Sequence, residues 1–456
     1  MSTRSLDTGK SEDTSGVAAP IDSAARSRMA RRAGIAAFVG TTIEIFDFYI
    51  YSTASALVLG ALFFPTVSPA IGTLVAFATI WVGFIARPLG GVIFGHFGDR
   101  LGRKKMLMIT LTMMGIATTL VGLLPTYGQI GIAAPLLLVT VRMLQGIAIG
   151  GEWGGAVLIA TEHAPKKKSI LFGAFAQQGS PVGNLLGTLA FIAITQLPEE
   201  QFTSWGWRIP FLFSAVLVIV GIVIRTRLEE SPEMESLRRS SAVVRLPLAE
   251  VLRSTPKVVV LGILAGAIGM ASSYVKTTFA LSWATEDIGF SRSTFLMVIM
   301  IALIAQVLAQ PFGAVLATRF DTRKAIVWIL VPEIFLMPLM FYLIGTGSTA
   351  LAIVGMVLAT FPHSMFYATL AGILSNAFPA RTRYTGISVC YQMSTTVFAG
   401  TAPFLCQYLL TTTGSITSVV ALTIGYVVLS LVCSLALLNR TPTPHGSSNI
   451  VGCEVQ

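Results

Sequence analysis

Twelve long apolar runs constrain what this 456-residue chain can fold into. An α-helix needs about 20 apolar residues to cross a bilayer. Only 11% of the residues are charged and 54% are hydrophobic, whereas soluble domains carry about 25% charged residues. We therefore predict an all-α polytopic membrane protein with two sets of six transmembrane helices, at 33–63, 71–97, 106–125, 132–160, 170–196 and 209–226, and at 258–283, 293–317, 325–345, 349–377, 385–411 and 416–438.

The basic residues predict the orientation of these helices. With both termini inside, the cytoplasmic segments hold 26 of the 31 lysines and arginines, and the outer loops hold only Arg208 and Arg292. Because basic loops stay on the cytoplasmic side, we read the net charge of +10 as this bias and not as a nucleic-acid surface. The chain is expected to sit in the inner (plasma) membrane without a cleaved signal peptide, as a cytoplasmic tail (1–31), a six-helix bundle (32–226), a cytoplasmic central loop with a surface helix (227–257), a second six-helix bundle (258–439) and a short cytoplasmic tail (440–456).

The most informative motif is the glycine-rich, basic stretch Gly91–Lys105 between the second and third runs. Its glycines let helix ends approach closely, and Asp99 can cap a helix N-terminus or pair with an arginine. A degenerate copy of this motif at 313–324 has Thr318 at the position that corresponds to Asp99, which argues against a capping role for the second loop. We predict a cytoplasmic gate built from Arg87, Gly95, Asp99, Arg100, Gly102, Arg103 and Lys104.

Two acids in the first apolar run are the leading candidates for proton coupling. Glu44 and Asp47 are three residues apart and share a helix face, and Tyr51 lies one turn further on. Two carboxylates this close in a low dielectric do not both ionise easily, and a carboxylate that titrates near neutral pH is what proton coupling requires. The alternative is that one acid only pairs with an arginine that holds helices together.

The fourth run adds a cation and a third acid. Arg142 keeps its proton, so inside a membrane we expect it to face a carboxylate or an anionic substrate. Glu152 lies about 15 Å further along the helix by helical rise, and Arg87, Arg142 or a cytoplasmic group could be its partner. A permanent structural ion pair is the alternative role for Arg142.

Several polar groups lie inside the other runs. Lys276 is suited to an anionic substrate or a carboxylate, unless it extends to the outer surface. Glu333 is assigned a structural role, and His363 either a hydrogen bond to a neighbour or a proton relay. Because amides and phenols can bind a small polar substrate or join helices, the substrate-binding candidates are Tyr51, Arg142, Gln177, Lys276, Gln306, His363 and Tyr367.

No catalytic or nucleotide-binding motif is found, and the four cysteines have no metal-site or disulfide spacing. We therefore expect no enzyme activity, metal or cofactor. An ion gradient remains as the energy source.

Several segments together resemble the metabolite:proton symporters of the major facilitator superfamily, whose members carry shikimate, 2-oxoglutarate, citrate, proline or betaine. The stretch Gly91–Lys105 resembles the signature loop of that superfamily, although Ile45 replaces the aromatic residue usual between the two acids of the first helix. The other resembling segments are 40–51, 59–65, 142–155, 160–165, 204–211 and 227–234. The resemblance implies alternating access of two bundles around a central site, with Asp99 in the inner gate and Asp47, Arg142 and Glu152 as coupling candidates.

The predicted function is proton-coupled uptake of a small organic acid of the shikimate or dicarboxylate type. The partners are that substrate, the proton and the lipid bilayer, with a monomer as the default. The closest alternative is a symporter of proline- or betaine-type osmolytes, and a drug/proton antiporter is a weaker one. A non-transporting receptor or scaffold on the same fold is a fourth reading.

Overall fold

The structure is a computed structural model that describes residues 23–66, 69–165, 168–194, 196–231, 234–236 and 246–440. Throughout these ranges the chain is helical, and they contain no β-strand. Most of both predicted tails and part of the central loop, residues 237–245, lie outside the described residues. The described central loop contains the predicted helix, α11 (Pro247–Ser254).

The first half follows the order of the first six apolar runs. The helix α1 begins at Ser23, well inside the segment predicted to be a tail, because the helical pattern continues through its arginines. The long helices are α1 (Ser23–Ala54), α3 (Pro69–Leu101), α4 (Arg103–Leu123), α6 (Ala133–Glu162), α7 (Ser169–Ile194) and α9 (Ile209–Thr226), and the short ones are a π-helical segment (Ser55–Leu59), α2 (Gly60–Phe63), α5 (Tyr127–Ile130), α8 (Glu199–Ser204) and a 3-10 turn (Gly206–Arg208).

The second half contains two interrupted helices. A π-helical segment, Val275–Phe279, breaks the first of them, and another, Thr395–Ala399, breaks the fifth. The elements in order are α12 (Pro256–Ala265), α13 (Ala267–Tyr274), α14 (Ala280–Trp283), a π-helical segment (Ala284–Ile288), α15 (Arg292–Arg319), α16 (Thr322–Gly345), α17 (Thr349–Ala377), a 3-10 turn (Ala380–Thr382), α18 (Arg383–Ser394), α19 (Ala402–Thr413) and α20 (Ile416–Leu438).

Glycines allow the helices of the first half to pack closely. A Cβ on Gly179 or Gly183 of α7 would lie 2.5 Å from a backbone oxygen of α1. On α6, a Cβ on Gly146 or Gly150 would collide with the backbone of α3. Small residues at helix contacts are the usual solution inside membranes, where burial against lipid gives little driving force.

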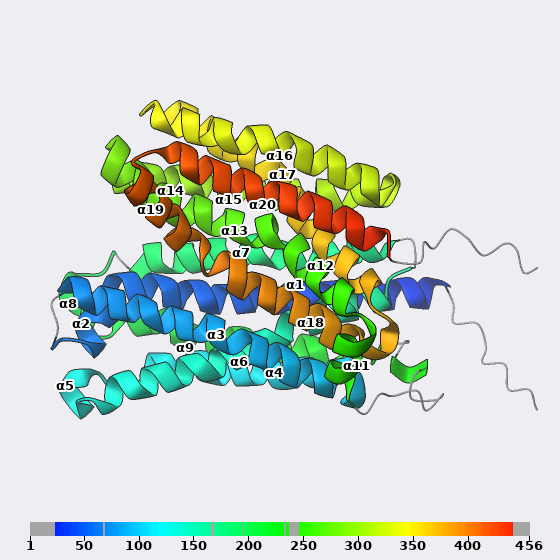
Figure 1. Ribbon diagram of the computed structural model, residues 1–456. Helices are drawn as coiled ribbons and strands as arrows, with labels where there is room; N and C mark the ends of the chain where they lie inside the picture. The colour runs from blue at the N-terminus through cyan, green and yellow to red at the C-terminus, as the bar shows by residue number, and fades with distance from the viewer. Residues whose placement is uncertain are drawn as a thin grey trace, which may run out of the picture.

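All the long helices run roughly along one axis, with α16 and α20 on one side of the bundle and α3, α4 and α6 on the other (Figure 1). In the part of the chain that is described, nine helices are long and apolar enough to cross a membrane. The remaining predicted spans correspond to α3, α7 and the pair α18–α19. The start of α1, the end of α20 and α11 lie at the same end of the bundle (Figure 1). We call this the basic end, because the loop from Asp99 to Lys105 lies there, and we call the opposite end, with α5 and α8, the far end.

Candidate functional site

At the basic end, Asp99 connects the two halves. Its carboxylate accepts hydrogen bonds from the backbone N–H groups of Tyr384 (3.2 Å) and Thr385 (2.9 Å), and from the Thr385 hydroxyl (2.9 Å). These N–H groups belong to the first turn of α18, where a helix presents unpaired donors and a positive dipole end. Asp99 is 1% exposed, so it closes a buried contact between the halves.

Buried charges extend this contact. Arg103 is fully buried and lies 3.5 Å from a carboxylate oxygen of Asp99 and 3.5 Å from one of Glu162. Arg383 of the second half donates to the other Glu162 oxygen at 3.3 Å. A guanidinium from each half therefore shares one carboxylate, and together with Asp99 these groups join the halves at the basic end.

The glycines of the motif have distinct tasks. Gly102 has φ = 111°, which glycine adopts readily, and it makes the turn between α3 and α4. A Cβ on Gly95 would lie 2.8 Å from the Thr385 Cα, so this glycine allows the halves to meet. Lys104 donates to the carbonyls of Thr226 and Leu228 in its own half, whereas Arg100 is exposed.

The second loop behaves differently from our expectation, which argued against capping. Asp321 is the N-cap of α16 and accepts from the N–H groups of Arg323 (3.1 Å) and Lys324 (3.2 Å). The prediction was wrong because the displaced acid caps its own helix. It is exposed, unlike Asp99.

Arg87 was predicted to belong to the gate, but it is not part of the contact around Asp99. It lies in the middle of α3 and lines a cavity of about 970 Å³ between the halves. Its guanidinium carbon is 4.4 Å from the ring centre of Phe84 and 5.0 Å from that of Phe48. Among the described residues, no carboxylate lies within ion-pair distance of Arg87, and its Nε has no hydrogen-bond partner.

The cavity extends from the middle of the molecule toward the far end. Most of its lining residues come from α1 and α7 of the first half and from α13, α15 and α17 of the second, and Arg87 of α3 and Tyr391 of α18 are among the others. They lie in the parts of these helices away from the Asp99 contact. The candidates Gln306, His363 and Tyr367 line this cavity, but Tyr51, Arg142, Gln177 and Lys276 do not.

The two acids of α1 have different surroundings. Asp47 is fully buried and accepts from the hydroxyls of Thr118 (2.8 Å) and Ser214 (2.5 Å). Glu44 is 4% exposed, and its Oε2 has no hydrogen-bond partner within the described residues. Asp47 is thus held by two hydroxyl donors inside the first half, whereas Glu44 has free accepting capacity.

Arg142 was expected to face a carboxylate or a substrate, but no carboxylate in the described ranges is within ion-pair distance. Its Nη1 donates to Gln145 at 2.5 Å, and its guanidinium carbon is 3.9 Å from the ring centre of Tyr51. Gln145 donates to Thr118 at 2.7 Å, and Thr118 donates to Asp47. A hydrogen-bond chain therefore joins Arg142 to Asp47. Tyr51 contributes its ring face, while its hydroxyl bonds Thr79 at 2.6 Å.

Glu152 pairs with Arg225, and not with Arg87 or Arg142. Arg225 Nη1 donates to Glu152 Oε2 at 3.0 Å, Nη2 pairs with Oε1, and Thr110 donates to Oε2 at 2.7 Å. From the sequence Arg225 counted among the cytoplasmic cations, but it is 1% exposed and lies between α1, α4 and α6.

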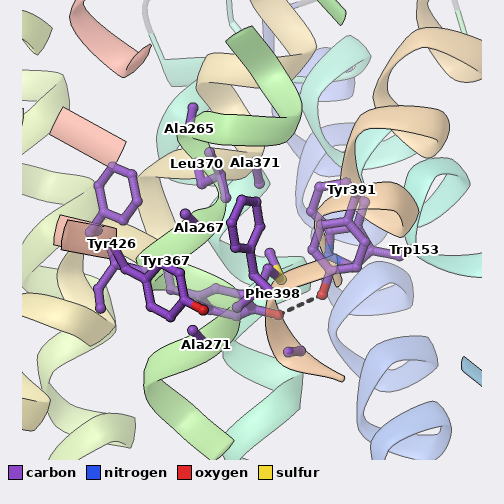
Figure 2. Close-up of a cluster of buried hydrophobic side chains, with 14 of the residues drawn as sticks. Trp153, Ala265, Ala267, Ala271, Tyr367, Leu370, Ala371, Tyr391, Phe398 and Tyr426 are labelled. Atoms are coloured by element: carbon purple, nitrogen blue, oxygen red, sulfur yellow. Dashed lines mark hydrogen bonds between the residues drawn. The ribbon is translucent and has the colours of Figure 1, made fainter. Parts of the chain in front are cut away.

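A stacked aromatic pair, Trp153 and Tyr391, joins the halves (Figure 2), and Tyr391 lines the cavity. The rings of Trp153 and Tyr391 are 3.5 Å apart and nearly parallel, and the Tyr391 hydroxyl bonds that of Tyr367 at 2.7 Å. Gln177 accepts from the Trp153 indole at 2.7 Å and donates to the Tyr367 carbonyl at 3.1 Å. Gln177 thus positions this cluster and does not line the cavity.

In the second half, Lys276 does not reach the surface. It is 4% exposed, and its Nζ donates to Thr360 at 3.1 Å. It interacts electrostatically with Glu333 and His363.

Sequence reasoning missed Arg225, Gln145, Thr118 and Ser214. Arg225 falls inside the sixth apolar run, and this position in the sequence could have indicated that its side chain is buried. Hydroxyls and amides inside apolar runs are too common to single out. No group of three or more metal-ligating side chains is placed to hold an ion in the described ranges.

Comparison with known proteins agrees with this architecture. The fold matches that of the proton:xylose symporter XylE, with a TM-score of 0.74 over 91% of this chain and 97% of that chain at 13% identity. It also matches the Escherichia coli fucose:proton symporter FucP, with a TM-score of 0.67, 11% identity and coverage of 90% and 98%. These likenesses show the fold, which is the one that both of these symporters have.

The sequence comparisons give the family. Residues 33–236 match the family "Sugar (and other) transporter", and residues 261–451 match "Major Facilitator Superfamily". The chain is 42% identical to the shikimate transporter of Escherichia coli (strain K12) over 84% of its own length and 88% of that protein. The inner membrane metabolite transport protein YhjE of the same strain is 40% identical (83% and 88% covered), and the proline/betaine transporter of Salmonella typhimurium is 33% identical (83% and 77%). The chain belongs to the metabolite:proton symporter family of the major facilitator superfamily. It is a multi-pass membrane transporter and not an enzyme.

Proposed function

We propose that this transporter takes up a small organic acid of the shikimate or dicarboxylate type together with protons. The observation that carries the proposal is Arg87, a cation on the wall of a central cavity with no carboxylate partner among the described residues. A guanidinium in a low dielectric binds a carboxylate in a directional, bidentate way. The similarity to a shikimate transporter supports the same class of substrate.

The topology is proposed as twelve spans in two six-helix bundles, 32–226 and 258–439, with both termini in the cytoplasm. The excess of basic residues at the basic end makes that end cytoplasmic, in the inner (plasma) membrane. The closed contact around Asp99 and the cavity toward the far end then correspond to an outward-facing state. Alternating access requires that this contact opens after the far end closes.

Asp47 and Glu44 are proposed to divide the proton coupling. Asp47 is joined through Thr118 and Gln145 to Arg142, so a change of its charge reaches a cation whose Nε and Nη2 have no hydrogen-bond partner among the described residues. Glu44 can accept a proton without breaking a hydrogen bond at Oε2. Glu152 is proposed to serve structure through Arg225. The energy source is the proton gradient, without a cofactor, and the transporter is proposed to act as a monomer.

Uptake into proteoliposomes with an inward proton gradient tests the proposal. Shikimate, 2-oxoglutarate, citrate, benzoate-type acids, proline and betaine are compared for the wild type, Asp47→Asn, Arg142→Ala and Arg87→Gln. Arg323→Gln, which neutralises an exposed arginine, is the matched control. We expect gradient-driven uptake of an acid by the wild type and by the control. The same uptake should be lost in Asp47→Asn, Arg142→Ala and Arg87→Gln.

The second candidate is an osmolyte symporter, favoured by the 33% identity to a proline/betaine transporter. Uptake of only the zwitterions would establish it and reject the organic acid. Unchanged behaviour of Asp47→Asn and Arg142→Ala would reject the coupling roles and favour a receptor or scaffold. Export of hydrophobic cations driven by the inward proton gradient would favour a drug/proton antiporter.

A further inference from the structure

A second cluster of buried ionisable groups lies in the second half, away from Asp47 and Glu44. Glu333 of α16 is fully buried, Lys276 is 4% exposed and His363 of α17 is 1% exposed. Lys276 interacts electrostatically with both of the others. Among the described residues, Lys276 is the titratable group that acts on this acid, and Lys276 also acts on His363.

The hydrogen bonding of this cluster is incomplete. Neither carboxylate oxygen of Glu333 has a hydrogen-bond partner among the described residues, and Lys276 is not within ion-pair distance of it. Lys276 donates instead to the Thr360 hydroxyl. A structural ion pair in a low dielectric is stable only with direct contact and satisfied oxygens. The carboxyl of Glu333 lacks both, so a permanent charge there is poorly supported.

The cluster also lies next to the central cavity. Lys276 belongs to the π-helical segment Val275–Phe279, whose neighbours Thr277 and Thr278 line the cavity. His363 lines it as well, and its Nδ1 has no partner within the described ranges. Such π-helical segments are frequent at functional sites, because they redirect side chains within a helix.

We propose that Glu333 is a second proton-binding site of the transporter, and that its protonation frees the charge of Lys276 to stabilise an anion in the cavity. This inference rests on the proposed function for its transport role, although proton binding itself can be tested without a substrate. A proton from the far side binds a Glu333 carboxylate oxygen and leaves toward the basic end, Lys276 keeps its three protons throughout, and no bond of the substrate changes.

The electrostatics give the proposal its direction. With Glu333 charged, it and Lys276 sum to zero and attract no anion. With Glu333 neutral, one positive charge remains beside the wall that His363 and Tyr367 form. An anionic substrate stabilises this state and a neutral or zwitterionic one does so less, so proton binding and anion binding favour one another.

Infrared difference spectroscopy of the purified transporter in lipid tests proton binding directly. Between about pH 9 and about pH 5, the wild type is expected to gain the carbonyl band of a protonated acid that Glu333→Gln lacks. In Lys276→Met, Glu333 is expected to stay neutral over the whole range, so a constant band is expected at each pH when the spectrum is compared with that of Lys276→Met combined with Glu333→Gln. Identical difference spectra for the wild type and Glu333→Gln, with no constant band in Lys276→Met, would overturn the proposal and leave a structural pair.

The transport role is tested by the ratio of protons to substrate in proteoliposomes, with shikimate as the probe. Glu333→Gln is expected to lose one proton per substrate while it keeps shikimate exchange, which needs no net proton movement. Thr360→Val is the control, because it removes the hydrogen bond to Lys276 and keeps both charges, so its ratio must equal that of the wild type. An unchanged ratio in Glu333→Gln would refute the transport role. If the wild type accumulates none of the acids, the proposed function fails, whereas the infrared result still decides proton binding.

Discussion

Removing Arg225 tests the reading of Glu152 as a structural group. Arg225→Met leaves the Glu152 carboxylate buried between α1, α4 and α6, with the Thr110 hydroxyl as its one donor within the described residues. Breaking a buried ion pair from one side costs roughly 3–5 kcal/mol. For a unit the size of the first half, 1 kcal/mol changes Tm by about 2–4 °C, so Tm is expected to fall by roughly 6–20 °C.

The measurement is the thermal unfolding of the purified variants, followed by tryptophan fluorescence. Arg227→Met, which removes an exposed arginine two residues away, is the matched control and should change Tm little. The double variant Arg225→Met with Glu152→Met removes both charges and should recover at least half of the loss, because no buried charge remains unpaired. Additive losses in the double variant would refute the reasoning, since independent residues behave in that way.

The remaining predictions concern the contact at the basic end, measured by cross-linking of cysteines placed at Thr161 and Ser375, whose hydroxyl oxygens are 3.0 Å apart across the halves. Gly154→Val is expected to reduce the yield strongly, because its side chain would collide with α18. Asp99→Asn should reduce it less, because the amide oxygen still accepts hydrogen bonds while the charge is lost, and Asp321→Asn should leave it unchanged. Equal cross-linking yields for Asp99→Asn and Asp321→Asn would contradict the role of Asp99 in joining the two halves at the basic end.

Much of the fold could be predicted because membrane helices are specified locally. Each apolar run became helical, although two runs of the second half are interrupted, and Gly102 lies at the turn between α3 and α4 where the motif indicated it. The exact ends of the helices were harder to predict from the sequence. The helix α1 begins at Ser23 within a polar segment, since helical hydrogen bonding does not stop where a span stops.

The site was harder to predict, because its partners come from distant helices. The sequence indicated that Asp99 could cap a helix N-terminus, and it caps α18, 285 residues further on. It could not show that Glu152 would meet Arg225 on another helix, or that Arg87 would lie in the cavity. Apolar runs define which side of a membrane a loop is on, but they do not define the rotation of one helix against the next, and that rotation selects the partners.

The distribution of satisfied and unsatisfied charges separates structural groups from working ones. At the basic end, Asp99 has three donors, and Glu162 lies between two arginines. Arg87 on the cavity wall and Glu44, next to the lining residue Ile45, keep polar atoms without a partner in the described part of the chain. A charge without a partner is costly inside a membrane protein. We therefore expect one to be kept where a mobile ligand supplies the partner. We propose that a carboxylate substrate is the partner of the arginine and a proton the partner of the acid, with the chemistry of transport at the cavity and the gate at the basic end.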